Sequence, residues 1–228
     1  RDGNDVMITT GGEQGIELAC KALCNPGDAV LCEEPSFIGA LNSFRSLGAV
    51  PVGVPMDADG INVEAFEKAA VRTGARLAYL IPTFQNPSGI TMSAEKRRAV
   101  YEIACRRSII IIEDNPYGEL RFAGSGVDTI KSIDREGAVI YCSSFSKILA
   151  PGIRIGFVQA PIAVISKMVV AKQVEDVHTP MLTQMMSYEF LTRYDLSSHI
   201  EKLRALYGSR AVREKVRAYA LPPRSLYA

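Results

Sequence analysis

Residues 109–117, Ile-Ile-Ile-Ile-Glu-Asp-Asn-Pro-Tyr, give the clearest indication of the fold class. The isoleucine run at 109–112 is β-branched throughout, and no polar residue interrupts it. A strand without a polar face is typical of one that helices cover on both sides, as in a parallel sheet. The polar residues from Glu113 to Tyr117 then stand where this strand ends. In α/β sheets the loops at that edge supply the ligand-binding groups.

Short apolar runs alternate with segments of helical periodicity on both sides of this stretch. We expect further strands at 29–32, 49–54, 77–81, 139–142 and 153–158, and helices at 18–23, 37–47, 62–71 and 94–106. Strands that alternate with helices of this length indicate an α/β fold, with a mostly parallel sheet sandwiched by helices.

The character of the chain changes after Pro161, because the remaining pattern is helical. Helices are expected at 162–172, 181–193 and 197–217. We therefore place a domain boundary near His178, with a large sheet domain over 1–178 and a helical segment over 179–228. The sequence begins without a methionine and stops shortly after two prolines. We expect it to be the central piece of a longer polypeptide, with the helical segment leading into a truncated small domain.

Composition narrows the class of protein. The chain has 228 residues and a formal net charge of +1, with its basic residues scattered, so it offers no field for nucleic acid. No apolar run approaches the roughly 18 residues of a membrane span. The five cysteines form no C-x-x-C pair, which favours reduced thiols in a cytoplasmic protein over a metal or redox site.

Polar residues follow several of the expected strands. Asp114 and Tyr117 follow the isoleucine run, and Asn86 follows the strand at 77–81. The strand at 139–142 is followed by two serines and a lysine, and a glycine-rich turn opens the first helix. These loops add Ser144, Ser146, Lys147, Gly11, Gly12 and Glu13.

This inventory suits a phosphorylated, aromatic, electrophilic cofactor. The glycines at a helix N-terminus let backbone N–H groups approach a phosphate. Ser144, Ser146 and the cationic Arg154 would complete that phosphate site through charge-assisted hydrogen bonds. A buried Asp114 would keep a pyridine nitrogen protonated, so that the ring can act as an electron sink.

The remaining polar groups suit the reactive end of such a cofactor. Asn86 and Tyr117 would hydrogen-bond a phenolic oxygen. Lys147 would form a Schiff base, with its amine made nucleophilic by desolvation and by nearby positive charge. Taken alone, Lys147 would be an ordinary surface lysine, and the case for it depends on the surrounding loops.

The motifs resemble those of the fold-type-I, class I and II aminotransferases, which depend on pyridoxal 5'-phosphate (PLP). The resemblance is carried by residues 82–89, Pro-Thr-Phe-Gln-Asn-Pro-Ser-Gly, by residues 113–117, and by residues 143–147, Ser-Ser-Phe-Ser-Lys. Asp114 stands 33 positions before Lys147, and Arg154 stands 7 after it, an order and spacing that match the family. The chain is most similar to the branch with kynurenine/2-aminoadipate and multisubstrate aromatic aminotransferases.

The resemblance implies a function and a role for each of these residues. The fold would be the large domain of a PLP-dependent transferase, acting as a homodimer that passes an amino group from an amino acid to a 2-oxo acid in ping-pong fashion. Lys147 would hold PLP and move the proton, Asp114 would partner the ring nitrogen, and Tyr117 the ring oxygen. Phe37 falls where relatives stack an aromatic ring on the cofactor, and the Asn86–Pro87 bond would be cis.

Two departures from the family are evident. Gly12 and Glu13 stand where many relatives have a serine and a glutamine; we expect the Glu13 side chain to point away from the phosphate. The family's carboxylate-binding arginine and a tyrosine from the neighbouring subunit correspond to regions outside this sequence. The identity of the substrates therefore stays open.

Several alternatives also stay open. The same cofactor could serve a lyase. It could also serve the ligand-sensing domain of a transcription regulator that has a winged helix upstream of Arg1. A third alternative is that the chain is an inert fragment. Gly11, Gly12 and Gly15 superficially suggest a dinucleotide site, but the spacing is wrong and we expect no strand before them. Tyr79, Tyr101 and Tyr141 are interpreted as packing residues rather than catalysts.

Overall fold

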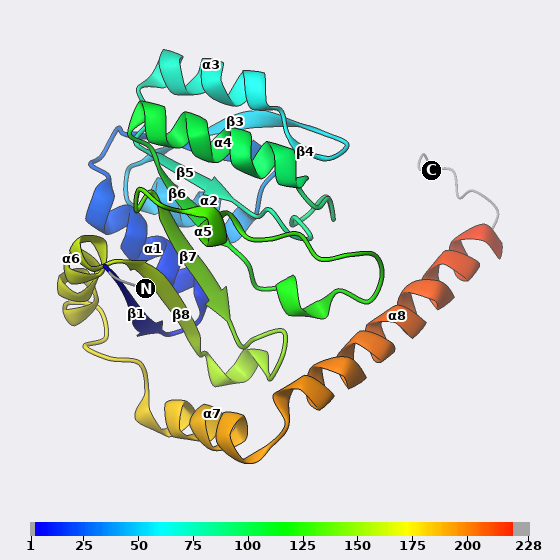
Figure 1. Cartoon of the computed structure of the whole chain (residues 1–228). Helices are drawn as coiled ribbons and strands as arrows, with labels where there is room; N and C mark the ends of the chain where they lie inside the picture. The colour runs from blue at the N-terminus through cyan, green and yellow to red at the C-terminus, as the bar shows by residue number, and fades with distance from the viewer. Residues whose placement is uncertain (1–2, 221–228) are drawn as a thin grey trace, which may run out of the picture.

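The computed structural model describes residues 3–220, with side chains through residue 211, and its centre is a single sheet (Figure 1). The strands lie in the order β1-β8-β7-β6-β5-β2-β3-β4. Their bounds are β1 Asn4–Thr9, β2 Ala29–Glu34, β3 Val50–Asp57, β4 Gly60–Ile61, β5 Leu77–Leu80, β6 Ile110–Asp114, β7 Val139–Ser144 and β8 Gly156–Pro161. The five neighbouring strands β7, β6, β5, β2 and β3 are parallel. Strands β8, β1 and β4 pair antiparallel with their neighbours.

Helices cover both faces of this sheet, which confirms the predicted α/β sandwich. Helices α1 (Gly12–Leu23), α2 (Ile38–Ser46) and α6 (Ile162–Gln173) bury one apolar cluster against the first face. Helices α3 (Val63–Thr73), α4 (Ala94–Arg107) and α5 (Ile130–Ile133) bury a second cluster on the other face. Ile111 and Ile112 are fully buried, one in each cluster, as the absence of a polar face predicts.

Two sequence-based expectations about strands were wrong. The expected strand at 153–158 is displaced: a short 3-10 helix η2 (Pro151–Ile153) comes first, and Arg154 adopts a left-handed conformation before β8 begins. The strand β1 was also missed, and it directly precedes the glycine-rich turn. It pairs antiparallel with β8 at the edge of the sheet, where Val6 and Ile8 remain exposed. The lack of a preceding strand is therefore no argument against a dinucleotide site, although the glycine spacing still is.

The C-terminal helices lead away from the sheet. Helix α7 (Met181–Arg193) follows α6, and α8 (Leu196–Ala220) runs diagonally along the side of the molecule opposite α6, as Figure 1 shows. Helix α8 contacts the short 3-10 helix η1 (Gly118–Leu120), where Arg204 Nε donates to the Glu119 carbonyl at 2.7 Å. The expected segment 179–228 thus contains these two helices, and its last residues, 221–228, lie outside the described part. Within that part, no helix is both long and apolar enough to cross a membrane.

Candidate active site

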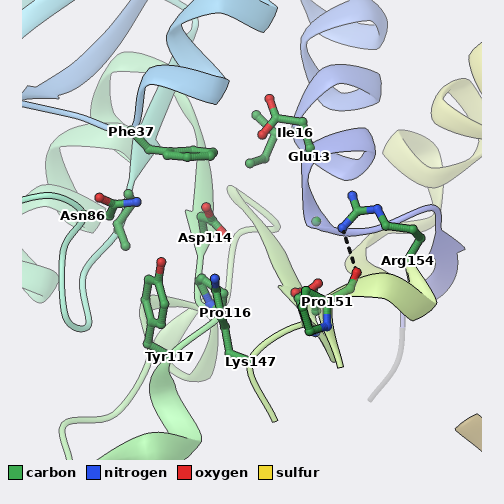
Figure 2. A pocket seen from close by; sticks show the side chains of 14 residues that line it. Glu13, Ile16, Phe37, Asn86, Asp114, Pro116, Tyr117, Lys147, Pro151 and Arg154 are labelled. Carbon is green, nitrogen blue, oxygen red and sulfur yellow. Dashed lines mark hydrogen bonds between the residues drawn. The ribbon is translucent and has the colours of Figure 1, made fainter. Parts of the chain in front are cut away.

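A cavity of about 290 Å³ lies at the carboxyl ends of β5, β6 and β7 (Figure 2). Asp114 and Ser144 are the last residues of β6 and β7, and Asn86 lies in the loop after β5. The cavity is lined by Gly12, Glu13, Ile16, Phe37, Ile81, Asn86, Asp114, Pro116, Tyr117, Ser144, Ser146, Lys147, Pro151 and Arg154. The structure therefore brings together all the site residues expected from the sequence except Gly11, which precedes Gly12 in the chain. The apolar members Ile16, Ile81, Pro116 and Pro151 were not expected.

One end of the cavity collects donors suited to a phosphate. Gly11 precedes α1 with φ 83° and ψ 169°, a conformation open essentially to glycine. A Cβ on Gly11 would lie 2.2 Å from Arg154 Nη2, so the glycine also makes room for the guanidinium. Gly156 faces the same turn, and a Cβ there would come within 2.6 Å of the Gly11 carbonyl carbon. The glycines thus let the start of α1 and the Arg154 segment approach each other.

Arg154 is held in place by its own backbone and by backbone oxygens. Its left-handed conformation follows η2, and its Nη1 and Nη2 donate to the carbonyls of Pro151 and Thr10 at 3.5 and 3.4 Å. The Ser146 amide donates to Ser144 Oγ at 3.3 Å on the same side of the cavity. A guanidinium, two hydroxyls and a helix N-terminus therefore surround one end.

Asp114 is a buried carboxylate with one strong hydrogen bond. It is 6% exposed, and Tyr79 Oη donates to its Oδ2 at 2.7 Å. Burial raises the pKa of Asp114 from an ordinary value of 3.8 to about 7, and the Glu13 charge adds to the rise while the Tyr79 bond opposes it. Tyr79 does pack as expected, edge-on to Phe44 with ring centroids 5.7 Å apart, but the packing interpretation missed its bond to Asp114.

Lys147 and Tyr117 border the other side of the cavity. Lys147 Nζ lies 5.8 Å from the centre of the Tyr117 ring. Burial raises the pKa of the Tyr117 phenol, the Asp114 charge raises it further, and the Asn86 amide opposes the rise. The Lys147 side chain is exposed among the described residues, and the activation of its amine by desolvation stays a prediction. The Asn86–Pro87 bond is cis, as the resemblance implies, and so is Glu34–Pro35 before Phe37.

Glu13 borders the cavity but its carboxylate lies toward α2. A Cβ on Gly39 would come within 2.8 Å of Glu13 Oε2, and Figure 2 shows this carboxylate on the side away from Arg154. Burial, followed by the charge of Glu17, raises the pKa of Glu13. The carboxylate is thus directed away from the phosphate end, although the side chain still forms part of the wall.

Buried polar residues fix the loops that carry Asn86 and Phe37. Arg97, 1% exposed, donates from Nη2 to the Pro82 carbonyl at 2.7 Å and to Thr83 Oγ1 at 3.0 Å. Gln85 Nε2 donates to the Pro35 carbonyl at 2.8 Å and so joins the two loops. Sequence reasoning placed Arg97 on a helix without this role, since nothing local marks a buried arginine.

A second cavity of about 640 Å³ adjoins the first and shares Asn86, Tyr117 and Lys147 with it. Its other walls come from the loop after β5, from η1 and its flank, and from α8: Phe84, Gln85, Pro87, Gly89, Leu120, Phe122, Tyr207, Arg210 and Ala211. Lys147 therefore lines two adjoining cavities, one with the donors suited to a phosphate and one with four aromatic side chains in its wall.

The donor set fits PLP. Cations, hydroxyls and a helix N-terminus match a phosphate, and a buried carboxylate stands where a pyridinium nitrogen could be paired. An amide and a phenol suit the ring oxygen, and a lysine amine is within the same cavity. Among the described residues, no group of three or more His, Cys, Asp or Glu could hold a metal ion.

Comparison with known proteins points to one family. The family model "Aminotransferase class I and II" matches residues 2–213. The aromatic-amino-acid aminotransferase 1 of Thermococcus litoralis is 39% identical over 90% of this chain and 51% of its own length. An HTH-type transcriptional regulator of Escherichia coli is 37% identical over 90% of this chain and 43% of its own length. The chain thus spans about half the length of the curated relatives it matches.

The solved structures agree with this assignment. The crystal structure of Pyrococcus horikoshii kynurenine aminotransferase, in complex with PMP and with kynurenine as substrate, has a TM-score of 0.93 and 36% identity. That match covers 99% of this chain and 57% of the other. The described residues of this chain therefore share the fold of that enzyme.

Proposed function

Because the chain belongs to the class I and II aminotransferases, we propose that it binds PLP and moves the amino group of an L-amino acid to a 2-oxo acid. The observation that carries this proposal is the single cavity in which Lys147, Asp114, Tyr117 and Arg154 meet. Each of these groups matches one chemical feature of the cofactor. A fold alone would not support an activity, because one fold can carry many functions.

Different residues around the cavity would bind different parts of the cofactor. Arg154, Ser144, Ser146 and the amides of Gly12 and Glu13 would bind the phosphate, with Gly11 making room for the guanidinium. Phe37 and Ile16 line the same space and would pack against the ring. When bound, PLP supplies an aldehyde carbon for the amino group and a ring that withdraws electrons from the substrate.

The chain's own groups would then supply binding and proton transfer. Asp114 would place its negative charge at the ring nitrogen, while Asn86 and Tyr117 would donate to the ring oxygen. Lys147 would hold the cofactor covalently and, once displaced by substrate, would take and return the proton at the substrate Cα as general base and acid. A single lysine serving both directions suits a ping-pong exchange, in which donor and acceptor use the site in turn.

The test is an absorption spectrum of the polypeptide that carries this chain, with PLP, before and after addition of a panel of amino acids. We expect a visible band that bleaches when an amino donor is added and returns with a 2-oxo acid. Lys147→Ala should abolish the band, because no amine remains to hold the cofactor. Lys68→Ala is the matched control: Lys68 is exposed on α3, pairs with Glu64 and does not line the cavity. No band in well-folded wild-type protein would refute the proposal.

A second candidate function follows from the similarity to an HTH-type regulator. In that case the same cavity would bind PLP as a sensed ligand. A band that forms but never converts with any amino donor would favour this candidate. Release of a 2-oxo acid together with ammonia, over many turnovers and without an acceptor, would instead favour a lyase.

We further propose that residues 1–178 act as the cofactor-binding domain of a cytoplasmic homodimer, with residues 179–228 leading toward a small domain. The boundary is supported by the sheet, whose described strands all precede α6. The five cysteines are free, which agrees with a reducing compartment. The exposed apolar side chains of α7 support an assembled protein.

A further inference from the structure

Tyr79 reaches Asp114 through the register of two neighbouring strands. β5 and β6 run parallel, and Tyr79 pairs with Ile112. Asp114 is two residues further along β6 and therefore points to the same face of the sheet as Ile112. An aromatic side chain can span this diagonal, and Tyr79 Oη donates to Asp114 Oδ2 at 2.7 Å.

The Tyr79 phenol is confined to the role of donor. Tyr79 is fully buried, and Phe44 packs edge-on against its ring. Burial and the charge of Asp114 raise the pKa of Tyr79 well above its ordinary value, so the phenol keeps its proton. No other hydrogen bond to the Asp114 carboxylate is formed by the described side chains. Oδ2 is therefore occupied, and Oδ1 is left for a donor in the cavity.

We propose that Tyr79 is a positioning residue that fixes the orientation and the charge of Asp114, so that Oδ1 is presented to the ring nitrogen of PLP. This inference rests on the proposed function. Tyr79 does not line the cavity and would not touch the cofactor. Its effect is transmitted through the Asp114 carboxylate, so it should change binding at the ring nitrogen only. Binding of the phosphate should be unchanged, because the expected phosphate ligands come from α1, β7 and the Arg154 segment.

A matched control is available on the opposite face of β6. Tyr141 on β7 pairs with Glu113, and its hydroxyl accepts a hydrogen bond at 3.0 Å from Asn115 Nδ2, two residues further along. Tyr141→Phe thus removes one hydroxyl with the same diagonal geometry and leaves Asp114 untouched. Tyr79→Phe keeps the ring that packs against Phe44 and removes the donor to Asp114.

The experiment compares the affinities of two ligands in the polypeptide that carries this chain. One is PLP, and the other is 1-deazapyridoxal 5'-phosphate, in which a C–H group replaces the ring nitrogen. The aldehyde and phosphate are common to both, so the ratio of their Kd values isolates the ring nitrogen. We expect wild-type protein to prefer PLP. Tyr79→Phe should lower this preference about tenfold, the scale of a hydrogen bond to a charged group, by weakening PLP binding alone.

The outcomes separate a positioning role from a structural one. Unchanged binding of the deaza compound would show that the cavity of Tyr79→Phe is intact, and Tyr141→Phe should match wild-type protein with both ligands. Equal weakening of both ligands, or an unchanged ratio, would overturn the role of Tyr79 while leaving the proposed function standing. Failure of wild-type protein to bind PLP would overturn both.

Discussion

The Asp114 carboxylate is buried, and we expect the ring nitrogen of the cofactor to compensate its charge. Its pKa of about 7 lies well above the ordinary 3.8, so burial disfavours the carboxylate form. A carboxyl whose folded pKa is raised contributes no penalty well below pH 3.8, where it is protonated in both the folded and the unfolded state. The penalty grows as the pH rises toward the folded pKa and stays constant above it. For a shift of this size the penalty reaches about 4 kcal/mol.

We predict that Asp114→Asn stabilises the cofactor-free protein relative to wild type increasingly between pH 4 and pH 7, because the uncharged amide avoids this penalty. Denaturant unfolding of both proteins at pH 4, 6 and 8 measures the difference. Glu33→Gln is the control: Glu33 is also buried, with a pKa raised by burial to about 7, but it does not line the cavity. Saturating PLP should remove the stability difference between wild type and Asp114→Asn. The stability difference between wild type and Glu33→Gln should stay the same. A flat difference across this pH range would contradict the prediction.

Side-chain type and position in a loop made most of the site residues predictable, and Asp114 shows the limit of that reasoning. Its place after a buried strand predicted that it would be buried in the cavity, as observed. Its bond to Tyr79 depends on the order and register of β5 and β6, which local sequence does not encode. The exposure of Lys147 was missed for the same reason, because it depends on which elements face the cavity.

At the scale of elements, runs of buried residues predicted the parallel strands well, and the edge of the sheet poorly. Strands β5, β6 and β7 are buried on both faces and stand out as apolar runs. Strand β1 is half exposed at the sheet edge, and its Asn-Asp-Val-Met-Ile-Thr sequence has only three consecutive apolar residues between polar ones. The start of β8 was misplaced because Ile153 and Ile155 extend the apolar pattern through a segment that turns at Arg154.

The close approach of the start of α1 to the Arg154 segment supports a prediction about Gly11. We expect Gly11→Ala to weaken PLP binding at least about tenfold, since a Cβ displaces Arg154 and removes a charge-assisted bond to the phosphate. It should also cost about 1–3 kcal/mol of stability through its left-handed backbone. Gly27→Ala is the control, because Gly27 also has a positive φ, of 91°, but a Cβ there would meet nothing within 4 Å.

PLP titration and thermal unfolding of the two variants separate these effects. Both should lose stability, and only Gly11→Ala should lose affinity for the phosphate end. Inorganic phosphate can be used as a competitor, since it binds that end alone. Equal PLP affinities for both variants would show that Arg154 does not hold the phosphate.

At the scale of the whole molecule, helix α7 lies apart from the sheet (Figure 1), and several of its large apolar side chains are exposed. Met181, Leu182, Met185 and Met186 are all more than half exposed, and their spacing places them on adjacent rows of the helix. A contiguous exposed apolar patch is typical of a contact surface. Full burial of each such side chain contributes about 1.5–3 kcal/mol, so together they could stabilise a dimer substantially.

We therefore predict that Leu182→Asp combined with Met185→Asp converts a dimer of the polypeptide into a monomer, because two charges would have to be buried in the contact. Light scattering coupled to size-exclusion chromatography measures the mass directly. Val71→Asp on α3 is the control, since Val71 is 60% exposed, close to the 59% of Met185, but lies on a different helix. The control should remain dimeric. If the double variant also remains dimeric, α7 is outside the subunit contact, and its apolar face must pack against another part of the same polypeptide.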